Sequence, residues 1–214
     1  QSNDKSNFEK SKKLSTEIDN LSNQQSKLQK ELNEVLSNIP NIALDDVPIG
    51  KDEKSNKLIK KVGDPKKFDF KIKSHVELGL TDNQIDFETS SKLSGSRFVV
   101  LKDKLALLER ALTNFMLDIH INKFGYTEIS PPLIVNEEVM YGTGQLPKFE
   151  ADQFEIKSNE KNKRKFLIPT AEVVLTNLFR ERIIEYKKLP LRLVAATPCF
   201  RKEAGSYGKD TKGM

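Results

Sequence analysis

The chain has 214 residues, 36% hydrophobic and 31% charged, with a formal net charge of +5 at pH 7. This length suits one medium domain or a small domain with an appendage, and the high charged fraction indicates an exposed, elongated part. No apolar run approaches the roughly 20 residues of a membrane span, and residues 1–4 begin no apolar signal segment, so we expect no membrane association. Because the chain begins with Gln1 rather than Met, we expect it to be incomplete at its N-terminus.

Residues 14–39 carry a heptad pattern, with one polar break at Gln25. Apolar residues alternate in steps of four and three at Leu14, Ile18, Leu21, Leu28, Leu32, Val35 and Ile39. This spacing is typical of a coiled coil, and the helix must end by Ile39 because Pro40 follows. An ordinary amphipathic helix on a globular core is the alternative, but the flanks are polar and no core element follows at once. We therefore expect residues 1–46 to belong to a coiled-coil arm, whose partner helix is upstream sequence or another subunit.

Residues 40–75 combine prolines and glycines with many charged residues, which predicts a connector and a domain boundary near residue 46. Within it, residues 51–73 carry nine lysines against four acids. Such a run is more often a solvated surface than a nucleic-acid site, and the run by itself does not distinguish between the two.

From Ser94 the pattern is that of a compact α+β core. A helix with one apolar face is predicted around residues 105–119 and should end at Gly125, and a second helix is predicted over 171–186. Short strands are predicted at 98–101, 126–129, 149–156, 164–168 and 191–196. The third and fourth would form a hairpin, with residues 157–163 as its exposed turn.

Cys199 is the single cysteine, so no intrachain disulfide can form. This fits a reducing compartment, and we expect a cytoplasmic protein. Beside Phe200, Cys199 is expected to be a small buried apolar residue. The alternative, a catalytic nucleophile, lacks a histidine nearby in sequence to activate it.

The segment Phe200-Arg201-Lys202-Glu203 carries the most chemistry, and a glycine-rich loop with two lysines follows it. Alternation along an extended chain places Arg201 and Glu203 on the same face. A guanidinium can hold a phosphate or carboxylate through two hydrogen bonds, and a carboxylate can accept from an amine. Taken alone, an Arg-x-Glu pattern is more often a surface ion pair than a site.

The context of these residues resembles the seryl-tRNA synthetases, a family of class II aminoacyl-tRNA synthetases. Residues 197–206 are similar to motif 2 of the family, and residues 125–133 are similar to motif 1, with Pro132 at its signature proline. Further segments similar to the family, in the family's order, are 39–42, 47–51, 75–79, 142–149 and 168–173. The resemblance implies that residues 47–214 hold the linker and the first part of a class II antiparallel-sheet core, with motif 1 and the start of motif 2.

The resemblance also implies a function: serine is activated by ATP, with Mg²⁺, to seryl-adenylate and transferred to the 3′ end of tRNA(Ser) by a homodimer that associates through motif 1. Arg201 would be the catalytic cation. The other implied site residues are Thr170, Ala171 and Glu172 for serine, Arg201, Lys202 and Glu203 for ATP, and Ser206, Lys209 and Lys212 for the tRNA acceptor end. No metal ligand is expected within this chain.

Three departures from the family pattern stand out. Lys209 and Lys212 replace the usual arginines, which weakens bidentate phosphate contacts, and Val174 stands where proline is common. The chain also stops at Met214, before the rest of motif 2 and motif 3, so we expect it to be C-terminally incomplete and inactive by itself.

Two alternatives stay open: a synthetase-like ligase that loads a carrier protein without charging tRNA, and a non-catalytic binding fragment. Against the first stands the arm heptad, because such relatives lack a long coiled coil.

Overall fold

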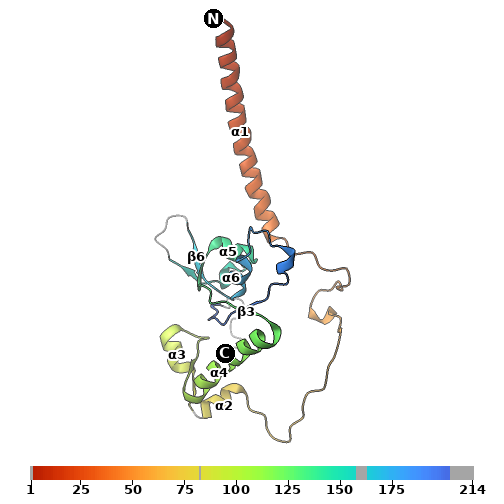
Figure 1. Cartoon of the computed structure of the whole chain (residues 1–214), viewed down its shortest axis with the longest axis vertical. Helices are drawn as coiled ribbons and strands as arrows, with labels where there is room; N and C mark the ends of the chain where they lie inside the picture. Colours follow the sequence, from red (N-terminus) through yellow and green to blue (C-terminus); the bar gives the residue numbers. More distant parts are fainter. Residues whose placement is uncertain (1, 82, 158–162, 203–214) are drawn as a thin grey trace. The chain divides into compact units, whose positions relative to one another are not determined.

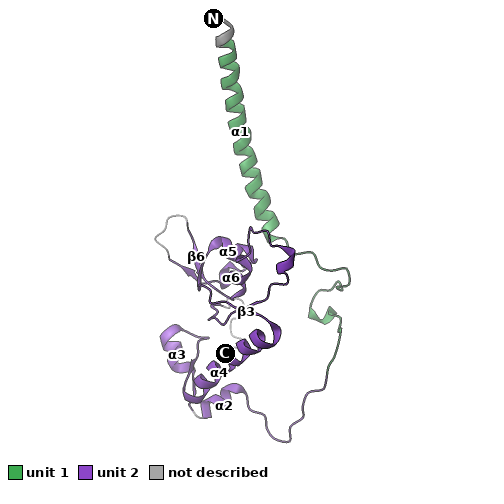
Figure 2. Ribbon diagram, viewed as in Figure 1, with its two compact units in different colours: residues 1–62 green, residues 63–214 purple. Residues whose placement is uncertain are grey.

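The computed structural model describes residues 2–81, 83–157 and 163–202, and the chain divides into two compact units (Figures 1 and 2). Unit 1 is Gln1–Val62 and unit 2 is Gly63–Met214. The boundary near residue 46, which composition suggested between arm and linker, stays a prediction.

Unit 1 consists of one long helix followed by a connector. Helix α1 spans Ser2–Asn38, so it ends just before Ile39 as Pro40 requires, and the short 3-10 helix η1 spans Glu53–Ser55. The apolar heptad positions of α1 are 51–64% exposed, at Leu14, Ile18, Leu21, Leu28, Leu32 and Val35. The predicted helix is confirmed, and within the described residues its apolar seam stays uncovered.

Unit 2 has an α+β fold of short strands and helices, which confirms the predicted fold class. Its elements in chain order are α2 His75–Thr81, β1 Ile85–Asp86, α3 Phe87–Ser94, β2 Val100–Leu101, α4 Asp103–Phe124, β3 Thr127–Glu128, β4 Ile134–Asn136, α5 Glu137–Gly142, η2 Glu150–Asp152, β5 Glu155–Ile156, β6 Lys165–Leu167, α6 Glu172–Asn177, η3 Tyr186–Lys188 and β7 Leu193–Val194. Strands β1 and β2 pair antiparallel, β3 and β7 pair parallel, and β4, β6 and β5 form an antiparallel sheet in that order.

The core of unit 2 lies between the three-stranded sheet and helices α5 and α6, which neighbour each other in Figure 1. Phe166 at the centre of β6 is fully buried and pairs with Val135 at the centre of β4. Ile168, two residues after Phe166, is also fully buried, as the alternation of a strand predicts. Met140, Leu146, Val173 and Val174 complete the cluster. This core therefore lies directly beneath the segment that follows β6.

Helix α4 confirms the predicted stop at Gly125, whose φ of 66° lies in the left-handed region that glycine adopts without strain. Its apolar face is only partly covered. Leu105 and Ile119 are half-buried, whereas four further residues of that face are 48–59% exposed, namely Leu108, Leu112, Phe115 and Met116. Within the described part of unit 2, most of this face lacks a packing partner.

Two sequence expectations need correction. The helix predicted over 171–186 is wrong beyond Asn177, where turns replace it, and Glu181 adopts a φ of 58°. The reason is burial: α6 is buried at Val173 and Val174, whereas Ile183 is fully exposed and gives a continued helix nothing to pack against. The hairpin is confirmed, but its first arm is shorter than predicted because η2 occupies residues 150–152 and only β5 pairs with β6.

Candidate active site

The two segments predicted to form the site lie side by side. The backbone N–H of Phe200 donates to the carbonyl of Ile168 at 2.9 Å. Arg201 Nε donates to the carbonyl of Pro169 at 3.1 Å, one of five N–H donors that a guanidinium offers. Arg201 is exposed while Pro169 is buried. The fold therefore anchors the predicted catalytic cation beside the predicted serine-binding segment.

The predicted serine-binding segment, residues 170–172, leads into α6. Thr170 is half-buried, and its Oγ1 accepts the backbone N–H of Glu172 at 3.3 Å. Ala171 precedes the helix and supplies no side-chain cap, so the Thr170 hydroxyl takes over part of that role. The side chain of Glu172 is exposed at the first residue of the helix. Thr170 thus follows directly after Pro169, whose carbonyl accepts the hydrogen bond from Arg201.

Helix α6 is fixed to α5 by a side-chain amide. Asn177 Nδ2 donates to the carbonyl of Val139 at 3.0 Å and to the carbonyl of Val173 at 2.7 Å. Asn177 is half-buried and also lies against Gly142, the last residue of α5. Sequence reasoning did not single out Asn177, because its role depends on the packing of α5 against α6.

The residue after Arg201 is held from two other segments. The Lys202 backbone N–H donates to the carbonyl of Asp152 at 2.9 Å, and Arg97 Nη1 donates to the Lys202 carbonyl at 3.4 Å. The Lys202 ammonium lies 5.5 Å from the centroid of the Phe154 ring, within the range of a cation–π contact. The other predicted site residues, Glu203, Ser206, Lys209 and Lys212, lie outside the described residues.

A charged cluster that sequence reasoning missed lies close to this segment. Arg164 donates to Glu155 through two bonds of 2.9 and 2.8 Å, to Glu137 at 2.9 Å, and to Glu150. Hydrogen bonds to Glu155 and Glu150 raise the pKa of Arg164, and the bond from Arg164 lowers the pKa of Glu155. The only signal in the sequence was an arginine between acidic residues, which has no meaning without the register of the hairpin.

Cys199 does not behave as expected. It is exposed, and its Sγ donates weakly to the carbonyl of Thr197 at 3.6 Å. The interpretation of a buried apolar residue is therefore wrong. The strand predicted at 191–196 ends at Val194, and the chain from there to Phe200 has no sheet partner that would bury this side chain within the described residues.

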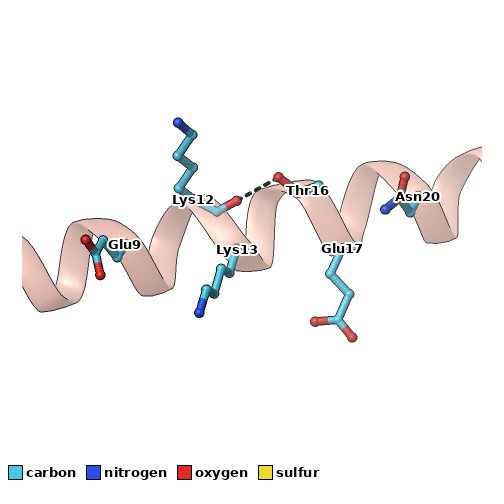
Figure 3. A pocket seen from close by; sticks show the side chains of 6 residues that line it. All are labelled: Glu9, Lys12, Lys13, Thr16, Glu17 and Asn20. Atoms are coloured by element: carbon cyan, nitrogen blue, oxygen red, sulfur yellow. Dashed lines mark hydrogen bonds between the residues drawn. The ribbon is translucent and has the colours of Figure 1, made fainter.

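Neither a metal cluster nor a membrane span occurs in the part of the chain that the structure describes. No group of three or more His, Cys, Asp or Glu side chains there is arranged to hold a metal ion. No described helix is both long and apolar enough to cross a bilayer. A shallow depression on α1 (Figure 3) is lined by one helix alone, with Thr16 Oγ1 donating to the carbonyl of Lys12. Such a depression is a gap between neighbouring side chains and offers no enclosure.

Comparisons with known proteins show which proteins this chain is similar to. Residues 152–214 match the family model of the tRNA synthetase class II core domain (G, H, P, S and T). The chain is 63% identical over 213 residues to a serine–tRNA ligase of Pelagibacter ubique, a match that covers 100% of this chain and 51% of that protein. It is 56% identical over 188 residues to a serine–tRNA ligase of Brucella canis, covering 88% and 43% respectively.

A solved structure is similar as well. The seryl-tRNA synthetase from Pyrococcus horikoshii, crystallised with ATP, superposes with a TM-score of 0.81 at 35% identity, covering 96% of this chain and 49% of that one. The fold and the paired motif segments are those of a class II aminoacyl-tRNA synthetase. Within that class, the chain belongs to the seryl-tRNA synthetase family. It spans about half the length of the curated relatives it matches.

Proposed function

We propose that the protein containing this chain is a serine–tRNA ligase. It would join serine and ATP to form seryl-adenylate with release of pyrophosphate, and then transfer the seryl group to the 3′ end of tRNA(Ser) with release of AMP. The observation that carries the proposal is the contact between residues 168–170 and residues 200–201. This contact supports the proposal because it joins the segment that leads into Thr170 and Glu172 to the segment that carries Arg201, and the named relatives support the choice of serine.

Arg201 is the proposed catalytic residue. In the first step an oxygen of the serine carboxylate attacks the α-phosphorus of ATP, and the bond from that phosphorus to the pyrophosphate oxygen breaks. Negative charge builds on the phosphoryl oxygens during attack, and a fixed guanidinium stabilises it most when it needs no reorientation. The bond from Arg201 Nε to the Pro169 carbonyl supplies that fixation. Lys202 and Glu203 would complete the ATP contacts.

Thr170, Ala171 and Glu172 are the proposed serine contacts. The Glu172 carboxylate is suited to accept from the serine ammonium, and the half-buried Thr170 hydroxyl to bond the small polar substrate. A site built around a substrate hydroxyl rejects the analogue that lacks it by roughly 10⁴-fold or more. Alanine should therefore be a very poor substrate.

ATP is proposed as the nucleotide because the Pyrococcus horikoshii relative was crystallised with it. Mg²⁺ accompanies ATP in the family, but the described residues contain no carboxylate or histidine cluster that fits a metal ion. We therefore assign no step of the mechanism in this chain to a metal.

The tRNA would contact both units. We propose that the exposed apolar seam of α1 packs against a second helix, so that residues 1–46 form part of a tRNA-binding arm, while residues 47–214 hold the linker and the first part of the catalytic domain. Ser206, Lys209 and Lys212 are proposed to meet the acceptor end. The arm favours this function over a ligase for a carrier protein, which needs no such extension. The proposed location is the cytoplasm.

The exposed face of α4, the helix that leads into motif 1, supports the proposed homodimer. Four large apolar side chains on this face are 48–59% exposed, which is unusual for a helix that stays in solvent. Replacing Phe115 with Glu in the full-length gene product should shift sedimentation from dimer to monomer, and an unchanged dimer would contradict this interface. The matched control is the substitution Arg182→Glu at an exposed residue.

The test of the proposed function is serine-dependent ATP–pyrophosphate exchange by the full-length gene product. Exchange with serine but not alanine, followed by charging of tRNA(Ser), is expected. Exchange without preference for serine would refute the proposal, and serine activation without binding or charging of tRNA would favour the carrier-protein ligase. Arg201→Ala should abolish exchange while Arg182→Ala leaves it unchanged. The 214 residues alone should show negligible aminoacylation, because they span about half of their relatives.

A further inference from the structure

Arg164 connects three elements through one guanidinium. It stands immediately before β6, and its carboxylate partners come from the start of α5 (Glu137), the start of η2 (Glu150) and β5 (Glu155). Its guanidinium carbon also lies 5.0 Å from the ring centroid of the fully buried Phe166. About two thirds of the Arg164 side chain is shielded, at 33% exposure, while the three glutamates are 44–49% exposed. The cluster is thus anchored on the core from one side.

The segment between Glu150 and Glu155 contacts motif 2 directly. The Asp152 carbonyl accepts the backbone N–H of Lys202 at 2.9 Å, and the Phe154 ring lies under the Lys202 ammonium at 5.5 Å. The Phe154 carbonyl in turn accepts the backbone N–H of Leu167 in β6 at 3.0 Å. Arg164 therefore ties down both ends of the short segment on which Lys202 rests.

We propose that Arg164 is a positioning residue for the adenylate-forming site. It holds Lys202, and through Lys202 the adjacent Arg201, in register with the proposed serine-binding segment. The inference rests on the proposed function. The side chain of Arg164 bonds to the three glutamates rather than to the proposed substrate contacts, and it acts through residues 150–155. Its planar fork satisfies two oxygens of Glu155 together with two further carboxylates, a geometry that a single ammonium cannot reproduce.

Charge makes the arrangement sensitive to loss of the guanidinium. Without Arg164, the carboxylates of Glu137, Glu150 and Glu155 would face one another without the cation that they share, and like charges repel. Lys202 is already close enough to lower the pKa of Glu155, behind the larger effect of Arg164. The uncompensated carboxylates would draw the Lys202 ammonium away from the Phe154 ring. Residues 150–155 would lose the ion pairs that hold both of their ends, at Glu150 and at Glu155, at the same time.

The test combines one readout on this chain with one on the full-length gene product. In the 214-residue chain, NMR hydrogen exchange measures protection of the Lys202 amide, which the bond to Asp152 should protect. Arg164→Met and Arg164→Lys should each raise its exchange rate by about 10-fold or more, while Arg182→Met leaves it unchanged. In the full-length product, both Arg164 variants should lower kcat/KM for ATP in pyrophosphate exchange by about 10- to 100-fold, because misplacement by about 1 Å costs on that order.

The outcomes separate the two proposals. If wild-type protein shows no serine-dependent exchange, the proposed function fails. The hydrogen-exchange protection of the Lys202 amide in the Arg164 variants then decides by itself whether Arg164 positions motif 2. If wild-type exchange is present but the Arg164 variants keep both the Lys202 protection and kcat/KM for ATP, the Arg164 proposal is overturned. A loss of thermal stability with these two quantities unchanged also overturns it, since it indicates a purely structural cluster. Should Arg164→Met fail to fold, Arg164→Lys decides by the same criteria.

Discussion

The contact between Asn177 and Gly142 offers a direct test of how α6, and with it the proposed serine-binding segment, packs against α5. Replacing Asn177 with Ala removes two hydrogen bonds, to the carbonyls of Val139 at 3.0 Å and Val173 at 2.7 Å. A net contribution of about 0.5–1.5 kcal/mol for each bond predicts a loss of about 1–3 kcal/mol in the free energy of unfolding.

Replacing Gly142 with Ala should be destabilising for a related reason. A Cβ at this position would lie 2.7 Å from Asn177 Oδ1 and 3.3 Å from Nδ2. The amide cannot swing away, because its two hydrogen bonds hold it. Overpacking of this kind costs about 1–3 kcal/mol. In the Asn177→Ala background the obstacle is gone, so the same substitution should be neutral or stabilising by up to about 1 kcal/mol from helix propensity.

The assay is urea unfolding of the chain followed by tyrosine fluorescence, since all four tyrosines lie in unit 2. The two single variants and the double variant form a cycle, with Thr176→Ala on the exposed side of α6 as the control. We expect a coupling free energy of at least about 1 kcal/mol between residues 142 and 177. Strictly additive effects, or a loss below about 0.5 kcal/mol for Asn177→Ala, would refute the seating of α6 described above.

Three further predictions concern the N-terminal part of unit 2. Gly79→Ala should lower the thermal midpoint strongly, because its Cβ would lie 2.2 Å from Cδ1 of buried Ile85; an unchanged midpoint would contradict this packing. Hydrogen bonds from Lys102 and, to a smaller extent, from Thr89 lower the pKa of Asp86 from 3.8 to about 2, so its stabilisation is complete only above about pH 5 and is lost progressively as pH falls to 2 and below. The deficit of Asp86→Asn in thermal melts should accordingly shrink over that range, and a constant deficit would argue against the ion pair. Gly125→Ala should cost about 1 kcal/mol in urea unfolding at this left-handed residue, and Gly125→Asn less; equal costs would argue against backbone strain.

The sequence-based predictions that the structure confirmed rest on local periodicity and on the order of short segments along the chain. The heptad over residues 14–39 predicted α1, and the step from an apolar face to Gly125 predicted the end of α4, because both signals depend only on neighbouring residues. The family followed from several short segments in a fixed order, each weak alone. Thr170, Glu172 and Arg201 came from those segments, and in the fold a hydrogen bond from Arg201 to the Pro169 carbonyl joins the two segments.

Tertiary structure decided what depends on contacts between distant residues. The helix predicted to Tyr186 ends at Asn177 because burial stops there, and Cys199 is exposed because the strand before it ends at Val194. The hydrogen bond between Arg201 and Pro169 joins residues 32 positions apart, and the Arg164 cluster joins residues up to 27 apart. Sequence patterns report the periodicity of a single element, whereas these contacts depend on how strands and helices pair. The proposed site residues could therefore be named from the sequence, but the groups that hold their segments in place could not.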